Sequence, residues 1–115
     1  MNQEKKSLYI LWISGDPVTA EKMVLMYGHN ALLKGWWENI TIIIWGASAA
    51  LVVGSVPIQE KIGQMIKDGV DFSACKACAD QLGASETLES IGVEVKYWGV
   101  SLTELVKEEK YLLTI

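Results

Sequence analysis

Apolar positions along the chain follow two alternating patterns, which predict strands and helices in turn. Short β-branched or every-other-residue runs predict strands at residues 8–14, 39–45, 70–74, 93–97 and 111–115. Apolar residues three or four positions apart predict helices at residues 17–34, 47–53, 57–67 and 103–109. Two shorter helices are predicted after Cys75 and from Ser85, with Ser85 as the cap of the second. Because the connections are short, we expect right-handed crossovers and one parallel sheet with helices on both faces.

The first predicted helix carries more apolar surface than one face of a sheet needs. Asp16 is placed to cap this helix, Pro17 is tolerated in its first turn, and Gly35 ends it. Leu25, Leu32 and Leu33 widen its apolar stripe beyond a single face. We therefore expect a second contact on this helix, such as one with another subunit.

Length and composition fit one globular domain over residues 1–115. Half of the 115 residues are hydrophobic, which is enough to build a core. The N-terminus shows no secretory cleavage site, so we expect a cytoplasmic protein. Residues 39–59 contain no charge, yet the β-branched run at 40–45, Gly46 and the break at Pro57 favour a strand followed by helices over a membrane span.

The charge pattern argues against a nucleic-acid partner. The net charge is −4 and all ten basic residues are lysines. Without arginine the chain has no bidentate fork for phosphates or guanines. The turn at residues 15–17 lacks the glycine and lysine pattern of phosphate-binding loops. We interpret Asp16 as a turn and cap residue that can also line a pocket beside the cysteines, and we expect neither nucleic acid nor a membrane as partner.

The turn Cys75-Lys76-Ala77-Cys78-Ala79-Asp80 is the most specific chemical signal in the chain. A C-x-x-C pair in a cytosolic protein indicates redox, sulfur or metal chemistry. A cysteine between a strand end and a helix start gains from unpaired amide N–H groups and the helix dipole, which favour the thiolate, and Lys76 adds a positive charge. Cys78 lies one helical turn further on, so it can attack a sulfur carried by Cys75.

Two other interpretations of the cysteines stay open. Both can be small buried hydrophobic residues. A structural zinc site needs four ligands, of which this pair supplies two, and the single histidine, His29, lies on a separate helix. No metal and no cofactor is therefore predicted. Ligands of parallel sheets bind beyond the carboxyl ends of the strands, where we expect the turns at 15–17, 46–48 and 75–78 to meet and the Cys75 sulfur to lie in a partly open pocket.

Several segments together resemble a known family. They are the opening strand with its long helix, the run Trp45-Gly46-Ala47-Ser48-Ala49-Ala50, the C-K-A-C-A-D turn and the closing segment 92–115. Over nearly its whole length the chain resembles the DsrE/DsrF-like proteins, especially the small YchN-like members. The resemblance implies a three-layer α/β/α fold with a five-stranded parallel sheet, assembly into trimers or hexamers, and a role in sulfur trafficking. Cys75 matches the cysteine that carries a persulfide in sulfur-relay members, and Cys78 matches the second cysteine of YchN-like members.

The leading hypothesis is a sulfur carrier or sulfurtransferase. Cys75 would hold a persulfide and Cys78 would resolve or share it, with Lys76, Asp80 and Asp16 in support. The partners would be a sulfur donor, an acceptor protein, and further copies of the chain in a homotrimer or homohexamer. The alternatives are a thiol–disulfide module that uses the same cysteine pair, and a non-catalytic ligand-binding or assembly protein in which the cysteines only pack.

Overall fold

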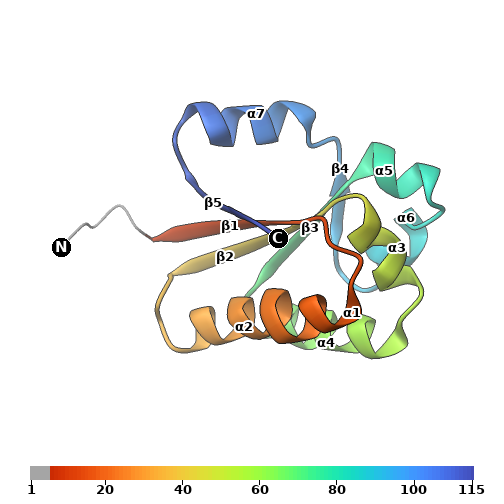
Figure 1. The fold of residues 1–115 in the computed structure, drawn as a ribbon, viewed down its shortest axis with the longest axis horizontal. Coiled ribbons are helices and arrows are strands. Elements are labelled where there is room, and N and C mark those ends of the chain that lie inside the picture. The colour runs from red at the N-terminus through yellow and green to blue at the C-terminus, as the bar shows by residue number, and fades with distance from the viewer. Residues whose placement is uncertain (1–5) are drawn as a thin grey trace.

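The fold is built on a parallel five-stranded sheet with the strand order β4-β3-β2-β1-β5 (Figure 1). A computed structural model describes residues 6–115 of the chain. The strands are β1 (Ser7–Trp12), β2 (Asn39–Ile44), β3 (Asp71–Cys75), β4 (Glu94–Lys96) and β5 (Tyr111–Thr114). The α/β fold class with a five-stranded parallel sheet, predicted from the sequence, is confirmed.

Helices lie on both sides of the sheet and at the carboxyl ends of its strands. The helices are α1 (Pro17–Thr19), η1 (Ala20–Leu25), α2 (Met26–Leu33), α3 (Ala47–Val53), α4 (Val56–Lys67), α5 (Lys76–Gln81), α6 (Ser85–Ser90) and α7 (Gly99–Lys107). The long segment of α1, η1 and α2 lies with α4 on one side, and α7 lies on the other (Figure 1). The short helices α3, α5 and α6 gather beyond the carboxyl end of the sheet (Figure 1).

The main core fills the space between the sheet and the α2–α4 layer. The side chains at alternate positions of the central strands point into it, among them Ile10, Ile42 and Ala74, each with no exposed surface. Gly28 of α2 lies so close to the sheet that an added Cβ would be 3.0 Å from Ile42 Cδ1. A larger residue at position 28 would therefore displace the Ile42 side chain or move α2 away from the sheet.

The first helix differs from its predicted form in its middle. Residues Ala20–Leu25 form a π-helical stretch, which the apolar spacing did not predict. Its ends agree with the sequence: the Asp16 carboxylate accepts a hydrogen bond of 2.8 Å from the Thr19 N–H, and Gly35 follows the helix at a φ of 71°. The wide turn leaves Val24 and Leu25 buried together.

Two further predictions about the helices need correction. The last helix begins at Gly99 rather than Thr103. Ser85 is not a cap: Ala84 occupies the N-cap position of α6, and the Ser85 hydroxyl bonds Asp80 instead. The uncharged stretch 39–59 divides among β2, α3 and the start of α4, and no helix within residues 6–115 is long and apolar enough to cross a membrane.

Candidate functional site at the cysteine turn

Cys75 and Cys78 occupy the junction of β3 and α5. Cys75 is the last residue of the strand and the N-cap of the helix, where its backbone is extended with φ −71° and ψ 117°. Cys78 is the third residue of the helix. Side chains at the N-cap and at the third helical position lie on the same side of the first turn. The predicted placement of Cys75 at the carboxyl end of a parallel strand is confirmed.

The Cys78 sulfur is bound by the neighbouring strand–helix turn. The backbone N–H of Gly46 donates a hydrogen bond of 3.1 Å to Cys78 Sγ. Gly46 has a φ of 73°, a conformation that glycine adopts without steric cost. Ser48 fixes this turn, because its buried hydroxyl accepts from the Trp45 N–H at 3.0 Å and donates to the Trp12 carbonyl at 2.6 Å.

The turn at residues 15–17 reaches the same edge of the sheet. A Cβ added to Gly15 would lie 3.0 Å from the Ala47 Cβ, so the first loop packs directly on the start of α3. The three turns predicted to meet at the carboxyl edge therefore do meet. Asp16 is exposed, and its hydrogen bonds from Thr19 lower the pKa of its carboxyl group. The structure confirms Asp16 as a cap and shows no contact between it and the cysteines.

The two cysteines differ in exposure, and Cys75 corrects the sequence analysis. Cys75 is 6% exposed and packs in an apolar cluster with Ile43 and Trp98, while Cys78 lies at the margin of the same cluster and is partly exposed. The expectation that the Cys75 sulfur lies in a partly open pocket is therefore wrong. The reason is the indole of Trp98, which covers this end of the sheet and which no local sequence pattern singled out.

Lys76 and Asp80 form an ion pair on the exposed side of α5. The Lys76 ammonium donates to Asp80 Oδ2 at 3.1 Å and lies 5.9 Å from the centre of the Tyr97 ring. The Ser85 hydroxyl donates to Asp80, and this bond, followed by the one from Lys76, lowers the pKa of the Asp80 carboxyl group. The bond to Asp80 raises the pKa of Lys76. Asp80 thus joins α5 to α6 through Ser85, and the Lys76 charge is paired with Asp80 within α5.

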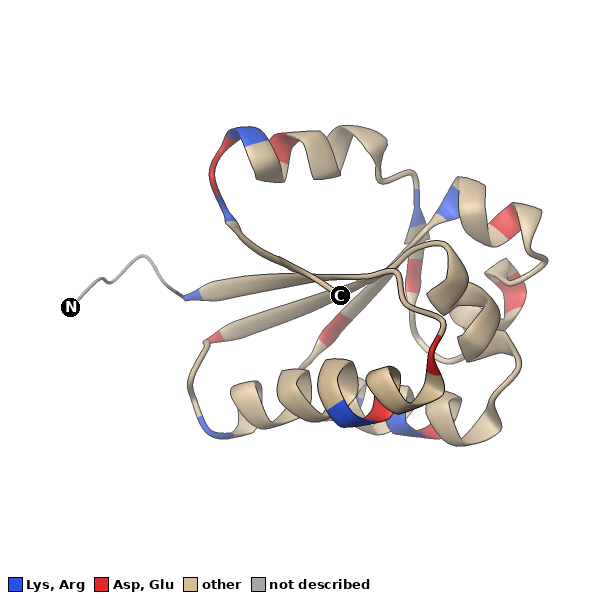
Figure 2. Cartoon of the chain, viewed as in Figure 1, with Lys and Arg blue, Asp and Glu red and all other residues tan. Residues whose placement is uncertain are grey.

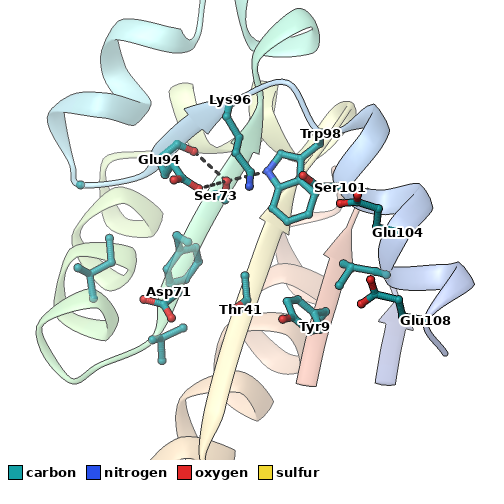
Figure 3. Close-up of a pocket in the computed structure, with 15 residues that line it drawn as sticks. Tyr9, Thr41, Asp71, Ser73, Glu94, Lys96, Trp98, Ser101, Glu104 and Glu108 are labelled. Carbon is teal, nitrogen blue, oxygen red and sulfur yellow. Dashed lines mark hydrogen bonds between the residues drawn. The ribbon is translucent and has the colours of Figure 1, made fainter. Parts of the chain in front are cut away.

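A hydrogen-bonded chain behind Cys75 was missed by the sequence analysis. Trp98 Nε1 donates to the Ser73 hydroxyl at 2.7 Å, and that hydroxyl donates to Glu94. The Lys96 ammonium lies 4.5 Å from the centre of the Trp98 ring. Ser73 could have been found, because it lies two residues before Cys75 and so faces the same side of the strand. Figure 3 shows these side chains at the inner end of a cavity beside α7.

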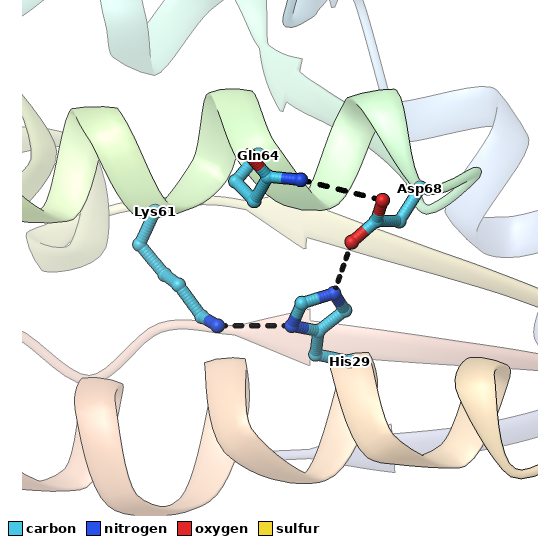
Figure 4. Close-up of polar contacts among 4 residues, drawn as sticks. All are labelled: His29, Lys61, Gln64 and Asp68. Carbon is cyan, nitrogen blue, oxygen red and sulfur yellow. Dashed lines mark hydrogen bonds and ion pairs between the residues drawn. The ribbon is translucent and has the colours of Figure 1, made fainter.

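His29 lies in a separate network on the opposite side of the sheet. Its Nε2 is 2.7 Å from Asp68 Oδ2 and its Nδ1 is 2.9 Å from the Lys61 ammonium, so the ring joins α2 to α4 (Figure 4). Gln64 donates to the other Asp68 oxygen at 3.3 Å. Across residues 6–115 no group of three or more His, Cys, Asp or Glu side chains could hold a metal ion.

Fold and site together define a class of protein. A parallel α/β sheet carries a cysteine pair in the turn after its third strand, at the carboxyl edge where such sheets place their sites. The chain belongs to the DsrE/DsrF-like family, whose profile matches residues 17–115.

Solved structures agree with this membership. The chain is similar to the conserved protein of unknown function BT1422 from Bacteroides thetaiotaomicron, with 34% identity, a TM-score of 0.95 and full coverage of both chains. It shares its fold with protein MTH1491 of unknown function from Methanobacterium thermoautotrophicum and with the ychN protein from E. coli. Each of these two has 16% identity, a TM-score of 0.71 and coverage of 96% of this chain, with 98% of the first and 99% of the second covered. No curated protein matches the chain.

Proposed function

We propose that the protein is a sulfur carrier in which the Cys75/Cys78 pair holds a sulfane sulfur as a persulfide. The observation that carries the proposal is the hydrogen bond from the Gly46 N–H to Cys78 Sγ, at the margin of a cluster that buries Cys75. A backbone N–H directed at sulfur stabilises negative charge there, as both a thiolate and a persulfide require. Membership of the DsrE/DsrF-like family supports this chemistry.

The exposures of the two cysteines favour Cys78 for the first step of this proposal. An incoming donor must reach the sulfur directly, and Cys78 is the more exposed of the two cysteines. Cys75, 6% exposed, would receive the sulfur second and shield it from water. This order reverses the one expected from the sequence, in which Cys75 accepts the sulfur first. In this proposal Asp80 supports the site by joining α5 to Ser85 of α6, and Lys76 by pairing with Asp80, rather than by contact with either sulfur.

The transfer needs no oxidant or reductant. The Cys78 thiolate attacks the outer sulfur of a donor persulfide, the donor S–S bond breaks, and the donor leaves as a thiolate that takes up a proton. A new S–S bond now joins Cys78 Sγ to the transferred sulfur. The Cys75 thiolate can attack that same outer sulfur, which moves the persulfide to Cys75 and returns Cys78 to a thiolate.

Mass spectrometry after mixing with a sulfane-sulfur donor tests this proposal. We expect the wild type and Cys75→Ser to gain the mass of one sulfur atom, and Cys78→Ser to gain it much more slowly. Iodoacetamide applied to the native protein should alkylate Cys78 before Cys75. Absence of the added sulfur in all three proteins would exclude persulfide chemistry.

Two other results would identify the alternatives. A Cys75–Cys78 disulfide that cycles within the cytosolic range of roughly −220 to −320 mV, without any persulfide, would indicate a thiol–disulfide module. Failure of iodoacetamide to label either cysteine in the native protein would indicate that the pair only packs.

We further propose that the chain forms a homotrimer or homohexamer. The helical segment η1–α2 and the loop after it expose apolar side chains: Met23 is 38% exposed, Met26 46%, Leu33 59% and Trp36 56%. Several large apolar side chains exposed along one segment are typical of a protein contact surface. Light scattering at micromolar concentration should give three or six times the chain mass. A monomer mass would overturn the proposal, and a dimer mass would reject threefold assembly.

A further inference from the structure

Ser48 is the one polar side chain of α3, and it is completely buried. The other residues of this helix are apolar, and Figure 2 shows no charge on it. Ser48 and Ser73 are the polar residues buried from solvent within residues 6–115. A buried hydroxyl is tolerated where its hydrogen bonds are made, so the partners of Ser48 indicate what this residue does.

The Ser48 hydroxyl joins the end of β1 to the turn after β2. It accepts a hydrogen bond of 3.0 Å from the Trp45 N–H and donates one of 2.6 Å to the Trp12 carbonyl. The Trp45 N–H also donates directly to the Trp12 carbonyl at 3.1 Å, and the Ala49 N–H donates to the Gly46 carbonyl at 3.0 Å. The backbone is therefore held on both sides of Gly46.

This fixed turn directs the Gly46 N–H at the sulfur of Cys78. The N–H donates to Cys78 Sγ at 3.1 Å, and Gly46 has φ 73° and ψ −130°, a combination that residues with a side chain rarely adopt. A hydrogen bond to an ionised sulfur is stronger than one to a neutral thiol. Because the Lys76 charge is paired with Asp80, a backbone dipole rather than a side-chain cation faces this sulfur.

We infer that Ser48 is a positioning residue for the chemistry of Cys78. Its hydroxyl does not touch the sulfur; it holds the Gly46 N–H in the orientation that stabilises negative charge on Cys78 Sγ. The inference rests on the proposed function only in assigning that charge to the sulfur that takes up the persulfide. The reactivity of Cys78 can be measured without any sulfur donor.

The pH profile of Cys78 alkylation by iodoacetamide tests the inference, with Cys75→Ser as the parent so that one thiol reacts. At about pH 7, Ser48→Ala should react about three- to ten-fold more slowly than the parent, because a less stabilised thiolate is less populated. At high pH, where the thiol is ionised in both proteins, the rates should agree within about two-fold. A merely structural loosening would instead raise the rate at every pH, since it would expose the sulfur.

Gly46→Ala is a second variant, and Gly35→Ala is its matched control. The two glycines have φ values of 73° and 71°, and a Cβ on either would meet nothing within 4 Å, so each substitution strains the backbone without a clash. Gly46→Ala should slow alkylation near pH 7 at least as much as Ser48→Ala, and Gly35→Ala should leave the profile unchanged. Because Ser48 acts through Gly46, the double variant Gly46→Ala/Ser48→Ala should lose no more than Gly46→Ala alone.

Two results would overturn the inference: a Ser48→Ala profile that coincides with that of the parent, and losses that add in the double variant. A displaced profile without any gain of sulfur mass by the wild type would support the inference and exclude persulfide chemistry. A gain of sulfur with an undisplaced profile would do the reverse. Circular dichroism checks the folding of each variant, and Ser48→Ala keeps the direct bond between Trp45 and Trp12.

Discussion

The two faces of the sheet are built from the same strands and differ in almost every other respect. On the face covered by η1, α2 and α4, the central strands present only apolar side chains, such as Ile10 and Ile42, with no exposed surface. On the face toward α7, the neighbouring positions of the same strands carry Tyr9, Thr41 and Ser73, and a cavity remains open above them. One face is a closed apolar core. The other is only partly covered and combines a small apolar cluster around Ile43 and Trp98 with polar positions that line the cavity.

Because of this difference, one face of the sheet mainly stabilises the fold and the other carries the groups that can bind ligands or react. Burial of aliphatic side chains stabilises the fold in proportion to the area removed from water, and the closed face supplies most of that area. The face toward α7 keeps hydroxyl, carboxylate and indole groups that can bind ligands, and it also carries Cys75 at its carboxyl edge. Adjacent residues of one strand should therefore respond very differently to substitution.

The largest effect is expected at the closed face. Ile42→Ala removes a side chain with no exposed surface from the centre of the core and should lower the free energy of unfolding by about 2–5 kcal/mol. Thr41→Ala, one residue earlier and facing the cavity, should change it by about 1 kcal/mol or less. Urea unfolding followed by circular dichroism measures both. Equal losses in the two variants would show that the faces do not differ in stability.

A smaller effect is expected where Trp98 closes the carboxyl end of the face toward α7. Trp98→Phe keeps a ring over Cys75 but removes the 2.7 Å hydrogen bond to Ser73, which should cost about 0.5–1.5 kcal/mol because the Ser73 hydroxyl keeps its bond to Glu94. Alkylation of Cys75 by iodoacetamide in a Cys78→Ser background should become faster.

The control for this variant is Val106→Ala, at a side chain of α7 that is 59% exposed, which should alter neither stability nor alkylation. An unchanged alkylation rate in Trp98→Phe would mean that Trp98 does not limit access to Cys75.

The same contrast explains what the sequence could and could not predict. The buried strands of the closed face could be predicted from β-branched runs such as residues 40–44. The position of Cys75 at the end of a strand could be predicted from the alternation of apolar and polar residues at 70–74. The burial of Cys75 under Trp98 could not be predicted, because the two residues lie 23 positions apart in the chain and no local sequence pattern relates them. The π-helical stretch at Ala20–Leu25 left one trace, because Leu25 lies outside the apolar stripe of a regular α-helix, and we interpreted Leu25 as part of a subunit contact. That interpretation of Leu25 is wrong: the wider turn places it in the core beside Val24.

The smallest effect is expected from the contact between His29 and Asp68, which joins α2 to the end of α4. The hydrogen bond with His29, and then the one from Gln64, lower the pKa of Asp68 below its ordinary value. A carboxyl group with a lowered pKa in the folded state stabilises the protein at pH values above its unfolded pKa of about 3.9, and this contribution disappears as the pH falls through the folded pKa. The wild type should therefore exceed Asp68→Asn in stability at pH 6, and the difference should shrink steadily below about pH 4.

Urea unfolding of both proteins across this pH range measures the difference in stability. The control for loss of one negative charge is Glu60→Gln, at an exposed carboxylate of α4. A difference that stays constant, or grows on acidification, would show that the His29–Asp68 contact does not stabilise the packing of α2 on α4.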